Sequence, residues 1–310
     1  MYRAGRGIPA LYYLVATIMN RKKSGSSAVK SQTKPKRTLT TRKKGGRGVL
    51  PLSLPIMSRT VWIVALMLLT VFIYCIYYFF IGPYSFRWKA IYREPIYPEG
   101  YNIRGIDISH YQDEIQWEKL RNASLNNDPV RFVIIKATEG MSLMDNNFNE
   151  NFYQAKQNGF VRGAYHFFVP EIDAAQQARF FLHQVHLEPG DLPPVLDVEK
   201  RGKLSKEELQ KAVKKWLNIV EKHYGVKPIL YTGYKFHKDV LHNPDLQQYP
   251  FWIAHYYVEK LKYKGPWIMW QHTDCGRVDG IRGYVDCNIF NGGLQDLMDL
   301  TLKENESMVE

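Results

Sequence analysis

Cysteine is scarce in this sequence, with three residues among 310. So few thiols exclude a small fold built on disulfide bonds, and without a CxxC pair or a Cys/His cluster nothing indicates structural zinc. No GxGxxG fingerprint or P-loop stands at a predicted strand–helix turn, which argues against a nucleotide-binding sheet. The sequence therefore predicts neither a metal ion nor a cofactor.

Acidic residues are missing from the first 59 positions, which hold 14 Lys and Arg. The whole chain has a formal net charge of +12, so the residues after position 59 have a net charge of −2 and form a slightly acidic body. Residues 20–48 offer little to bury, which predicts a disordered basic tail over residues 1–59. Such a tail suits anionic lipid head groups. A nucleic-acid arm is the less favoured alternative, because no aromatic residues interleave with the basic ones of residues 20–48.

Charge is also absent from residues 60–82, which are mostly apolar. At ~1.5 Å per residue this run is long enough for the ~30 Å hydrocarbon core of a membrane. By the positive-inside rule we expect an uncleaved signal anchor, with the N-terminus cytoplasmic and the body periplasmic or extracellular. A cleaved signal peptide fits less well, because bulky residues 77–80 stand where small ones are needed. Met57 would be an ordinary start for a short anchor, so we assign residues 1–56 no function and expect an overlong gene start as an alternative.

Beyond a proline-rich linker predicted over residues 83–100, apolar runs alternate with helical patterns. Helices are predicted over 148–159, 173–187 and 205–224, and the last has a capping box of Ser205 and Glu208 and ends at Gly225. Eight strands are predicted, at residues 102–109, 131–140, 161–169, 192–199, 227–233, 251–256, 267–273 and 284–290.

Alternating strands and helices predict an α/β fold with a parallel sheet covered on both faces. Eight strands suggest closure into an irregular TIM-like barrel over residues 101–298, followed by a polar tail at 299–310. A body of about 200 residues is shorter than a full (β/α)₈ barrel of ~250, which fits the loss of helices after the fifth strand. An open doubly wound sheet is the alternative, weakened by the missing nucleotide-binding motif.

Carboxylates stand at the ends of predicted strands. Asp197 and Glu199 are two residues apart, so the strand period of two directs both side chains to one face. Asp107 and Asp286 repeat this placement on the first and last strands. Those strands are neighbours in a closed barrel, whose C-terminal rim holds the catalytic groups. We therefore expect four carboxylates to meet at one mouth.

Acidic side chains gathered in this way are costly to bury unless they are paired or used. Like charges raise at least one pKa, which provides the protonated acid and the ionised carboxylate that glycoside hydrolysis requires. Structural capping aspartates and a divalent-metal site are the alternatives. A D-x-E pair with two further acids argues against the first, and the lack of matching His ligands argues against the second.

Aromatic residues also lie near the C-terminal ends of the predicted strands. Tyr165, Tyr231, Trp252 and Trp270 would stack on sugar rings, with ordinary core packing as the alternative for each. Strand alternation allows only one of Tyr165 and His166 to face the mouth.

Seven motifs, in order, resemble the family 25 glycoside hydrolases, which are N-acetylmuramidase lysozymes: RGIDISHYQ, FVIIKATEG, GAYHFF, PPVLDVE, PILYTG, WIAHY and WQHTDCGRVDGIRGYVDCNIFNG. The resemblance covers roughly residues 101–296. It implies a (β/α)₅(β)₃ barrel and hydrolysis of the β-1,4 bond between N-acetylmuramic acid and N-acetylglucosamine in peptidoglycan. It also implies roles for individual residues: Glu199 as general acid, Asp197 as its partner, Asp107 and Asp286 as flanking acids, Tyr165, Tyr231, Trp252, Trp270 and Gln271 as shaping the sugar site, and Glu139 as a further candidate.

A neighbouring D-x-E pair is most consistent with participation of the substrate's own 2-acetamido group, which Asp197 would orient while Glu199 protonates the glycosidic oxygen. Inverting and retaining displacements stay open, since the sequence gives no carboxyl separation. A glycan-binding protein without turnover is the alternative function, disfavoured by the presence of both acids. The expected partners are peptidoglycan strands and a membrane, with no nucleic acid and no obligate protein.

Cys275 and Cys287 flank a hairpin-like segment and would face an oxidising compartment. A disulfide between them is therefore an open expectation. Cys75 lies within the predicted membrane span and is expected to be inert.

Overall fold

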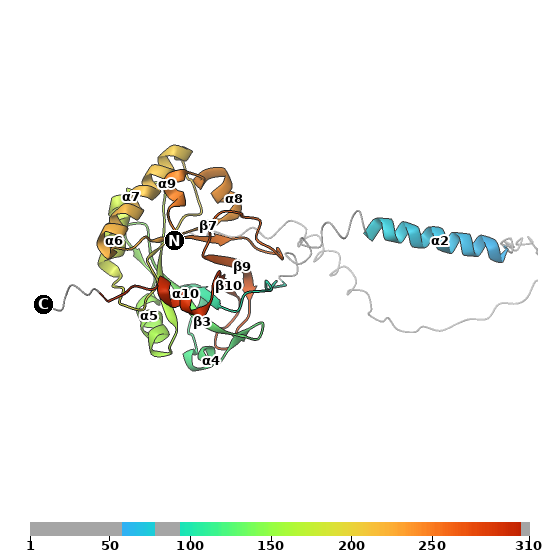
Figure 1. Ribbon diagram of the computed structural model, residues 1–310, viewed down its shortest axis with the longest axis horizontal. Coiled ribbons are helices and arrows are strands. Elements are labelled where there is room, and N and C mark those ends of the chain that lie inside the picture. The colour runs from blue at the N-terminus through green and yellow to red at the C-terminus, as the bar shows by residue number, and fades with distance from the viewer. Residues whose placement is uncertain (1–57, 78–93, 305–310) are drawn as a thin grey trace, which may run out of the picture. The chain divides into compact units, whose positions relative to one another are not determined.

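The computed structural model describes residues 58–77 and 94–304 (Figure 1). Several sequence predictions lie outside the described residues: the basic tail, the end of the apolar run, most of the linker and the last part of the C-terminal tail.

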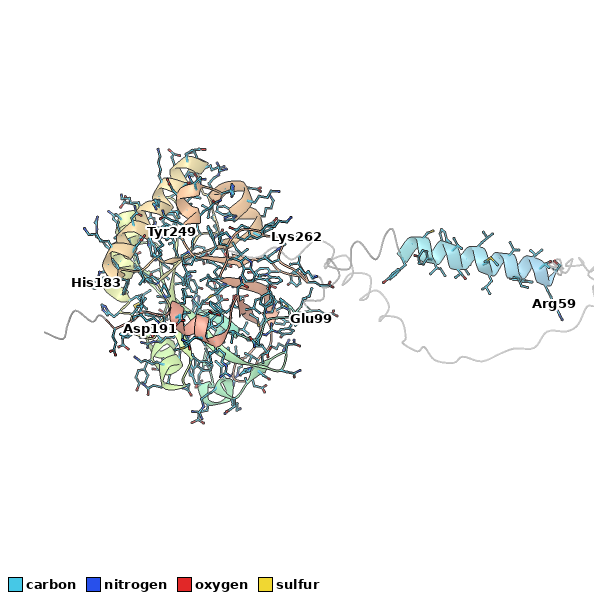
Figure 2. The ribbon with its side chains drawn as sticks, viewed as in Figure 1. Arg59, Glu99, His183, Asp191, Tyr249 and Lys262 are labelled. Atoms are coloured by element: carbon cyan, nitrogen blue, oxygen red, sulfur yellow. The ribbon has the colours of Figure 1, made fainter. Side chains whose placement is uncertain are left out.

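The apolar run forms helix α2, Arg59–Ile76. None of its residues is buried, and its side chains stand out from the helix along its whole length (Figure 2). A helix of this length spans about 27 Å. Among the described residues, it is the one helix with the length and composition to cross a membrane.

Eight strands close into a barrel, as predicted. They are β1 (Arg104–Ile108), β3 (Asp128–Glu139), β5 (Val161–Phe167), β6 (Val195–Asp197), β7 (Ile229–Gly233), β8 (Phe251–Ala254), β9 (Met269–Gly276) and β10 (Val285–Phe290). Each is hydrogen-bonded to the next, and β1 pairs with both β3 and β10, which closes the ring. Two short strands, β2 (Ser124–Leu125) and β4 (Leu143–Met144), pair with β3 outside this ring.

Strand β10 runs antiparallel to both of its neighbours, β9 and β1, whereas the other neighbouring pairs of the ring are parallel. The expectation of a wholly parallel sheet is wrong for this strand. The reason is the connection: β9 ends at Gly276 and β10 begins at Val285. A parallel crossover needs about a dozen residues or more, so this shorter segment returns as a hairpin.

Helices follow the first five barrel strands and lie outside them (Figure 1). A short helix η3 (His110–Gln112) and α4 (Trp117–Arg121) follow β1, α5 (Phe148–Gln157) follows β3, α6 (Ala174–Gln184) follows β5, α7 (Lys206–Tyr224) follows β6, and α8 (Tyr234–Phe236), η4 (His237–Leu241) and α9 (Pro244–Gln247) follow β7. In the described chain no helix separates β8, β9 and β10, and α10 (Leu294–Leu300) comes last. This order matches the (β/α)₅(β)₃ arrangement that the resemblance implies.

The apolar core has two parts, because successive side chains of a strand face opposite sides. Outside the sheet, Leu196 and Val198 pack with Phe181 of α6 and Trp216 of α7. Inside the barrel, a second cluster includes Phe132, Val195, Ile229, Trp252 and Met269. A filled interior leaves the ends of the strands as the place where polar side chains meet.

Candidate active site

Asp107 on β1 and Asp286 on β10 are register partners. Asp107 stands near the end of its strand, and Asp286 is the second residue of its own. The sequence reasoning placed Asp286 at the end of a last parallel strand. Because β10 is antiparallel, the start of this strand lies at the C-terminal ends of the parallel ones, so both carboxylates are at the same mouth.

Asp197 is the last residue of β6, in register with Phe167 of β5 and Tyr231 of β7. Its side chain is buried, and no donor among the described residues hydrogen-bonds to its Oδ1. Burial raises the pKa of Asp197 well above its usual range, and repulsion from the charges of Glu199 and Asp107 raises it further. Glu199, two residues beyond, is exposed. Carboxylates from β1, β6 and the loop after β6 therefore interact at one mouth.

The carboxylate of Asp107 accepts two amide hydrogen bonds at the same oxygen. Gln271 Nε2 donates to Asp107 Oδ2 at 2.6 Å, and Asn288 Nδ2 donates to it at 2.8 Å. Burial raises the pKa of Asp107 to about 7, although these two bonds lower it, and the charge of Glu199 contributes to the rise. Near neutral pH this group is therefore divided between its protonated and ionised forms.

The orientation of the Gln271 side chain is fixed by two tyrosines. Tyr231 donates its hydroxyl to Gln271 Oε1 at 2.7 Å, and Tyr256 donates to the same oxygen. The amide nitrogen is thereby left to face Asp107. Tyr165 also lies among the acids: burial raises its pKa, and the charges of Asp107, Asp197 and Asp286 add to the rise.

The two predicted sugar-site tryptophans lie on opposite faces of the sheet. Trp252 lies in the barrel interior, where its Nε1 donates to Asn288 Oδ1 at 2.8 Å, and it is only 2% exposed. Trp270 alternates with Gln271 on β9 and so faces the other side of the sheet, where its Nε1 donates to the carbonyl oxygen of His255 at 2.9 Å. The expectation for Trp270 is thus corrected by strand alternation, whereas Trp252 packs against Tyr231, with ring centroids 4.5 Å apart.

The choice between Tyr165 and His166 is settled in the same way. His166 faces outward: its Nδ1 lies 2.7 Å from Thr138 Oγ1, its Nε2 lies 3.1 Å from Gln177 Oε1, and its ring stacks on Trp216. Burial lowers its pKa to about 4. His166 is therefore a neutral core residue, and Tyr165 takes the inward position.

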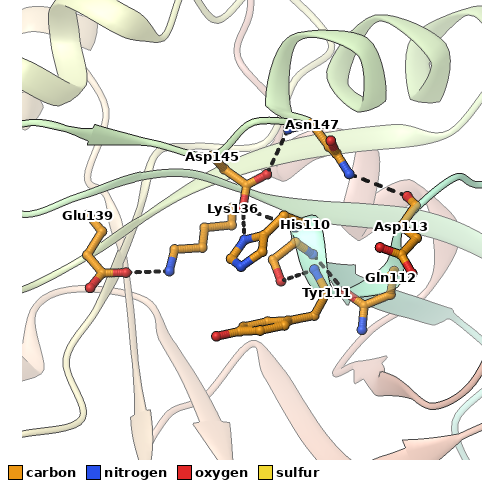
Figure 3. A network of polar contacts seen from close by, with 9 residues as sticks. His110, Tyr111, Gln112, Asp113, Lys136, Glu139, Asp145 and Asn147 are labelled. Carbon is orange, nitrogen blue, oxygen red and sulfur yellow. Dashed lines mark hydrogen bonds and ion pairs between the residues drawn. The ribbon is translucent and has the colours of Figure 1, made fainter. Parts of the chain in front are cut away.

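Glu139, the further candidate, forms an ion pair with Lys136 Nζ at 2.6 Å (Figure 3). The ammonium group of Lys136 also lies over the Phe167 ring, 5.1 Å from its centroid. The positive charge of Lys136 lowers the pKa of Asp197, whereas the negative charge of Glu139 raises it. This ion pair therefore contributes to the electrostatics of the acid cluster.

The loops after β1 and β3 are tied together beside this ion pair. Both the backbone N–H and the Nδ1 of His110 contact Asp145 Oδ2, at 3.0 and 2.6 Å (Figure 3). The helix η3 that carries His110 is held by a capping box between Ser109 and Gln112. This rim of the mouth is consequently preorganised.

Sequence reasoning missed three residues of the site: Lys136, Asn288 and Tyr256. Two of them carried a usable signal. Lys136 is the one charged residue in the apolar stretch 132–138, and Asn288 shares a strand face with Asp286 because it is two residues further on. The contact of Tyr256 with Gln271 depends on the path of the loop after β8, which no local pattern reveals.

Cys275 and Cys287 are buried free thiols, so the expected disulfide is wrong. The strand register is the reason, because it places Cys287 opposite Thr273 rather than opposite Cys275. Each sulfur instead has an oxygen partner: Cys275 Sγ lies 3.0 Å from Thr273 Oγ1, and Cys287 Sγ donates to Val285 O at 3.7 Å.

Comparison with known proteins assigns the chain to a family. The model described as "Glycosyl hydrolases family 25" matches residues 106–281, which include Asp107, Asp197 and Glu199. The chain belongs to this family. Among the described residues, no group of three or more His, Cys, Asp or Glu side chains is placed to hold a metal ion.

Two sequence relatives illustrate the family's range. The chain is 47% identical over 201 residues to "Uncharacterized protein YegX" of Escherichia coli (strain K12), covering 64% of this chain and 74% of the relative. It is 32% identical over 213 residues to "Lysozyme M1" of Streptomyces globisporus, covering 64% and 71%.

Solved structures give the same assignment. A bacterial lysozyme from Streptomyces coelicolor superimposes with a TM-score of 0.60 at 29% identity, over 66% of this chain and 98% of that one. A family 25 glycosyl hydrolase from Bacillus anthracis gives a TM-score of 0.59 at 30% identity, over 66% and 96%.

Proposed function

We propose that this glycosyl hydrolase is a muramidase that cleaves the β-1,4 bond between N-acetylmuramic acid and N-acetylglucosamine in peptidoglycan. The observation that carries the proposal is the pair of Asp197 and Glu199: one is a buried carboxylate with an unpartnered oxygen, the other an exposed acid two residues away. Relatives named lysozyme and "N,O-diacetylmuramidase" support the choice of substrate.

In this proposal Glu199 protonates the glycosidic oxygen as the bond to the anomeric carbon breaks. The carbonyl oxygen of the substrate's 2-acetamido group attacks that carbon, and the resulting ring is opened by water, which loses a proton to Glu199. Asp197 Oδ1 accepts the acetamido N–H and stabilises the positive charge that develops there. The lack of a protein donor to this oxygen supports such a role, because a buried acceptor without a hydrogen bond is energetically unfavourable.

The flanking acids contribute to the electrostatic potential around the reacting groups. Asp107, held by Gln271 and Asn288, faces Asp286 across the two closing strands. Tyr165, Tyr231 and Gln271 line the sugar site, with Glu139 at its edge beside Lys136. Direct inverting or retaining displacement by the same carboxylates is the alternative mechanism.

We further propose that α2 and the residues after it form a signal anchor, with residues 1–59 cytoplasmic and the barrel of residues 101–298 outside the cytoplasm. Its length and composition support this proposal, together with the 14 basic residues at positions 1–59. Protease treatment of intact cells tests the orientation. We expect the protease to cleave the barrel once the outer envelope has been made permeable while the inner membrane stays intact. Protection of the barrel under these conditions would contradict this orientation.

Analysis of the products tests the activity. The full-length protein in detergent is incubated with purified peptidoglycan, and the new reducing ends are reduced with borohydride and identified after acid hydrolysis. Reduced muramic acid is expected from a muramidase. Reduced glucosamine would identify a glucosaminidase instead, and saturable binding without new reducing ends would favour the alternative of a glycan-binding protein.

A further inference from the structure

Charge is unevenly distributed around the barrel. Residues 200–264 hold 14 Lys and Arg and only 6 Asp and Glu, a net charge of +8, whereas residues 60–199 and 265–310 together have a net charge of −10. The basic stretch contains β7, β8 and the segments that follow β6, β7 and β8. These segments are neighbours, because β7 pairs with both β6 and β8. One side of the barrel is therefore basic.

Basic side chains on this side stand at the mouth. They follow the C-terminal ends of β6, β7 and β8, where the acid cluster lies, and they are exposed. None of them forms an ion pair with a described residue. We name this set the basic rim: Lys200, Arg201, Lys203, Lys238 and Lys262. Unpaired exposed cations are available to an anionic ligand.

The loop after β6 brings the basic rim next to the reacting acids. The ammonium group of Lys200 lies over the Phe167 ring, 5.5 Å from its centroid, and Phe167 is the register partner of Asp197. The loop is tied to its neighbour, because the backbone N–H of Lys203 donates to Glu171 Oε1 at 3.1 Å. The basic side chains of this loop are therefore held beside Asp197.

The segments after β7 and β8 extend the positive charge. A hydrogen bond from Lys235 lowers the pKa of Asp239, and the charges of nearby lysines that include Lys238 lower it further. Burial lowers the pKa of His255, the first residue after β8, and the charge of Lys262 adds to this effect. Positive potential thus continues from the loop after β6 to the segment after β8.

The opposite side of the mouth is acidic. Strands β1 and β3 stand opposite β7 and β8 in the closed ring of eight. The segments after β1 and β3 supply the carboxylates of Asp113, Glu114, Glu118 and Glu150 to one cavity of about 740 Å³. An anionic group at the mouth is therefore attracted to the side of β6, β7 and β8 and repelled from the other.

The chemistry of the proposed substrate supplies such a group. In muramic acid the acetamido group is on C2, and the lactyl group that carries the peptide stem is on the adjacent ring carbon, C3. Because Asp197 holds the acetamido N–H in the proposed reaction, the stem leaves the sugar beside the loop that carries Lys200. Stem peptides have free carboxylates, which Lys and Arg bind through charge-assisted hydrogen bonds.

We propose that the basic rim binds the carboxylates of the peptide stem on the muramic acid whose bond is cleaved. The proposal rests on the proposed function. Lys200 and Arg201 meet the stem first, and Lys238 and Lys262 attract carboxylates further along it. Anionic lipid head groups are the less favoured partner, because a membrane against these residues would cover the mouth at which Glu199 is exposed.

Two substrates that differ only in stem charge test the proposal. One is purified peptidoglycan, and the other is the same material after a carbodiimide and ammonia have converted its free carboxyl groups to amides. The full-length protein in detergent is assayed at low salt, since salt screens exposed charges. For the wild type, amidation is expected to raise KM about fivefold and to change kcat little.

Lys200→Gln/Arg201→Gln removes two charges of the basic rim. It is expected to raise KM for native peptidoglycan about fivefold and to leave KM for the amidated substrate unchanged. An effect transmitted through the neighbouring Glu199 would alter the turnover of both substrates equally, so the difference between them isolates the stem. The matched control, Lys211→Gln/Lys222→Gln, removes two exposed charges of α7 outside the basic rim and should behave like the wild type.

A second variant tests the rim away from Glu199. Lys238→Gln/Lys262→Gln should raise KM for native peptidoglycan about twofold and leave KM for the amidated substrate unchanged. Equal changes on both substrates, or no change with either folded variant, would overturn the proposal. An effect seen only in vesicles that contain phosphatidylglycerol, and not in detergent, would assign the basic rim to lipid and overturn it as well.

Sedimentation with the two kinds of peptidoglycan separates this inference from the proposed function, because it requires no turnover. Tighter binding to native than to amidated peptidoglycan, lost in Lys200→Gln/Arg201→Gln, is expected. The same result without any release of reducing ends would refute the muramidase and leave the basic rim standing. Equal binding and equal KM for the two substrates, with reducing ends released, would overturn the basic rim and leave the muramidase standing.

Discussion

Gln271 on β9 donates its side-chain amide to Asp107 on β1 at 2.6 Å, across the antiparallel strand β10 that lies between them. Strand β10 adds a second donor, Asn288, to the same carboxylate oxygen. Three adjacent strands thus hold one buried acid whose pKa is raised to about 7 by burial. Keeping this buried carboxylate ionised lowers the free energy of unfolding, and the difference can be measured.

Asp107→Asn is expected to stabilise the barrel above pH 7. The pKa of Asp107 is higher in the folded protein than in the unfolded chain, so the folded state binds the extra proton and stability falls as pH rises from about 4 to about 7. At ~1.4 kcal/mol per pKa unit, the gain for the variant at pH 8 is at most about 4 kcal/mol. Chemical denaturation at pH 5 and pH 8 measures it.

The matched control is Asp279→Asn, at an exposed position outside the mouth. It should leave the pH dependence of unfolding as it is in the wild type. Equal effects of the two variants, or destabilisation of Asp107→Asn at pH 8, would contradict the account of Asp107.

Lys136→Met is expected to shift the acid limb of the pH–rate profile upward by about one pH unit. The positive charge of Lys136 lowers the pKa of Asp197, so its loss leaves that carboxyl protonated to higher pH. Because the proposed reaction needs Asp197 ionised, activity on the acid side of the optimum should drop most. Rates of peptidoglycan hydrolysis between pH 4 and pH 8 provide the measurement. Lys211→Met, on the exposed face of α7, is the control, and an unshifted limb for Lys136→Met would refute this role.

The two cysteines of the β9–β10 pair are expected to behave as buried thiols. In the native protein Cys275 and Cys287 should resist alkylation, since both are almost fully buried and burial raises the pKa of Cys287 far above its usual range. After denaturation without reductant, mass spectrometry should find both alkylated. A mass two units lower with both positions unlabelled would instead reveal a disulfide.

Local patterns predicted much of the fold. The capping box of Ser205 and Glu208 and the stop at Gly225 gave α7 its limits, because these signals act within one helical turn. The sequence placed Asp197 and Glu199 together at the end of one strand, where their charges interact, although β6 ends at Asp197 and the strand period does not reach Glu199. Barrel closure made the strands of Asp107 and Asp286 neighbours.

Other features depend on relations that no local pattern carries. Strand β10 is antiparallel because the segment that connects it to β9 is too short for a parallel crossover. Trp270 faces outward because its neighbour on β9, Gln271, faces inward. The disulfide expectation failed because the register of two strands, rather than their proximity, decides which side chains meet. Contacts such as Tyr256 with Gln271 need the folded loop itself.

The most direct test of the central claim is the turnover of peptidoglycan by Glu199→Gln. The substitution keeps the size of an exposed side chain, so the fold should persist, as checked by circular dichroism and thermal unfolding. We expect hydrolysis to fall by at least about a thousandfold, because the proton donor of the reaction is lost. Glu207→Gln, in the first turn of α7, should retain full activity. Near-normal release of reducing ends by folded Glu199→Gln would contradict the account.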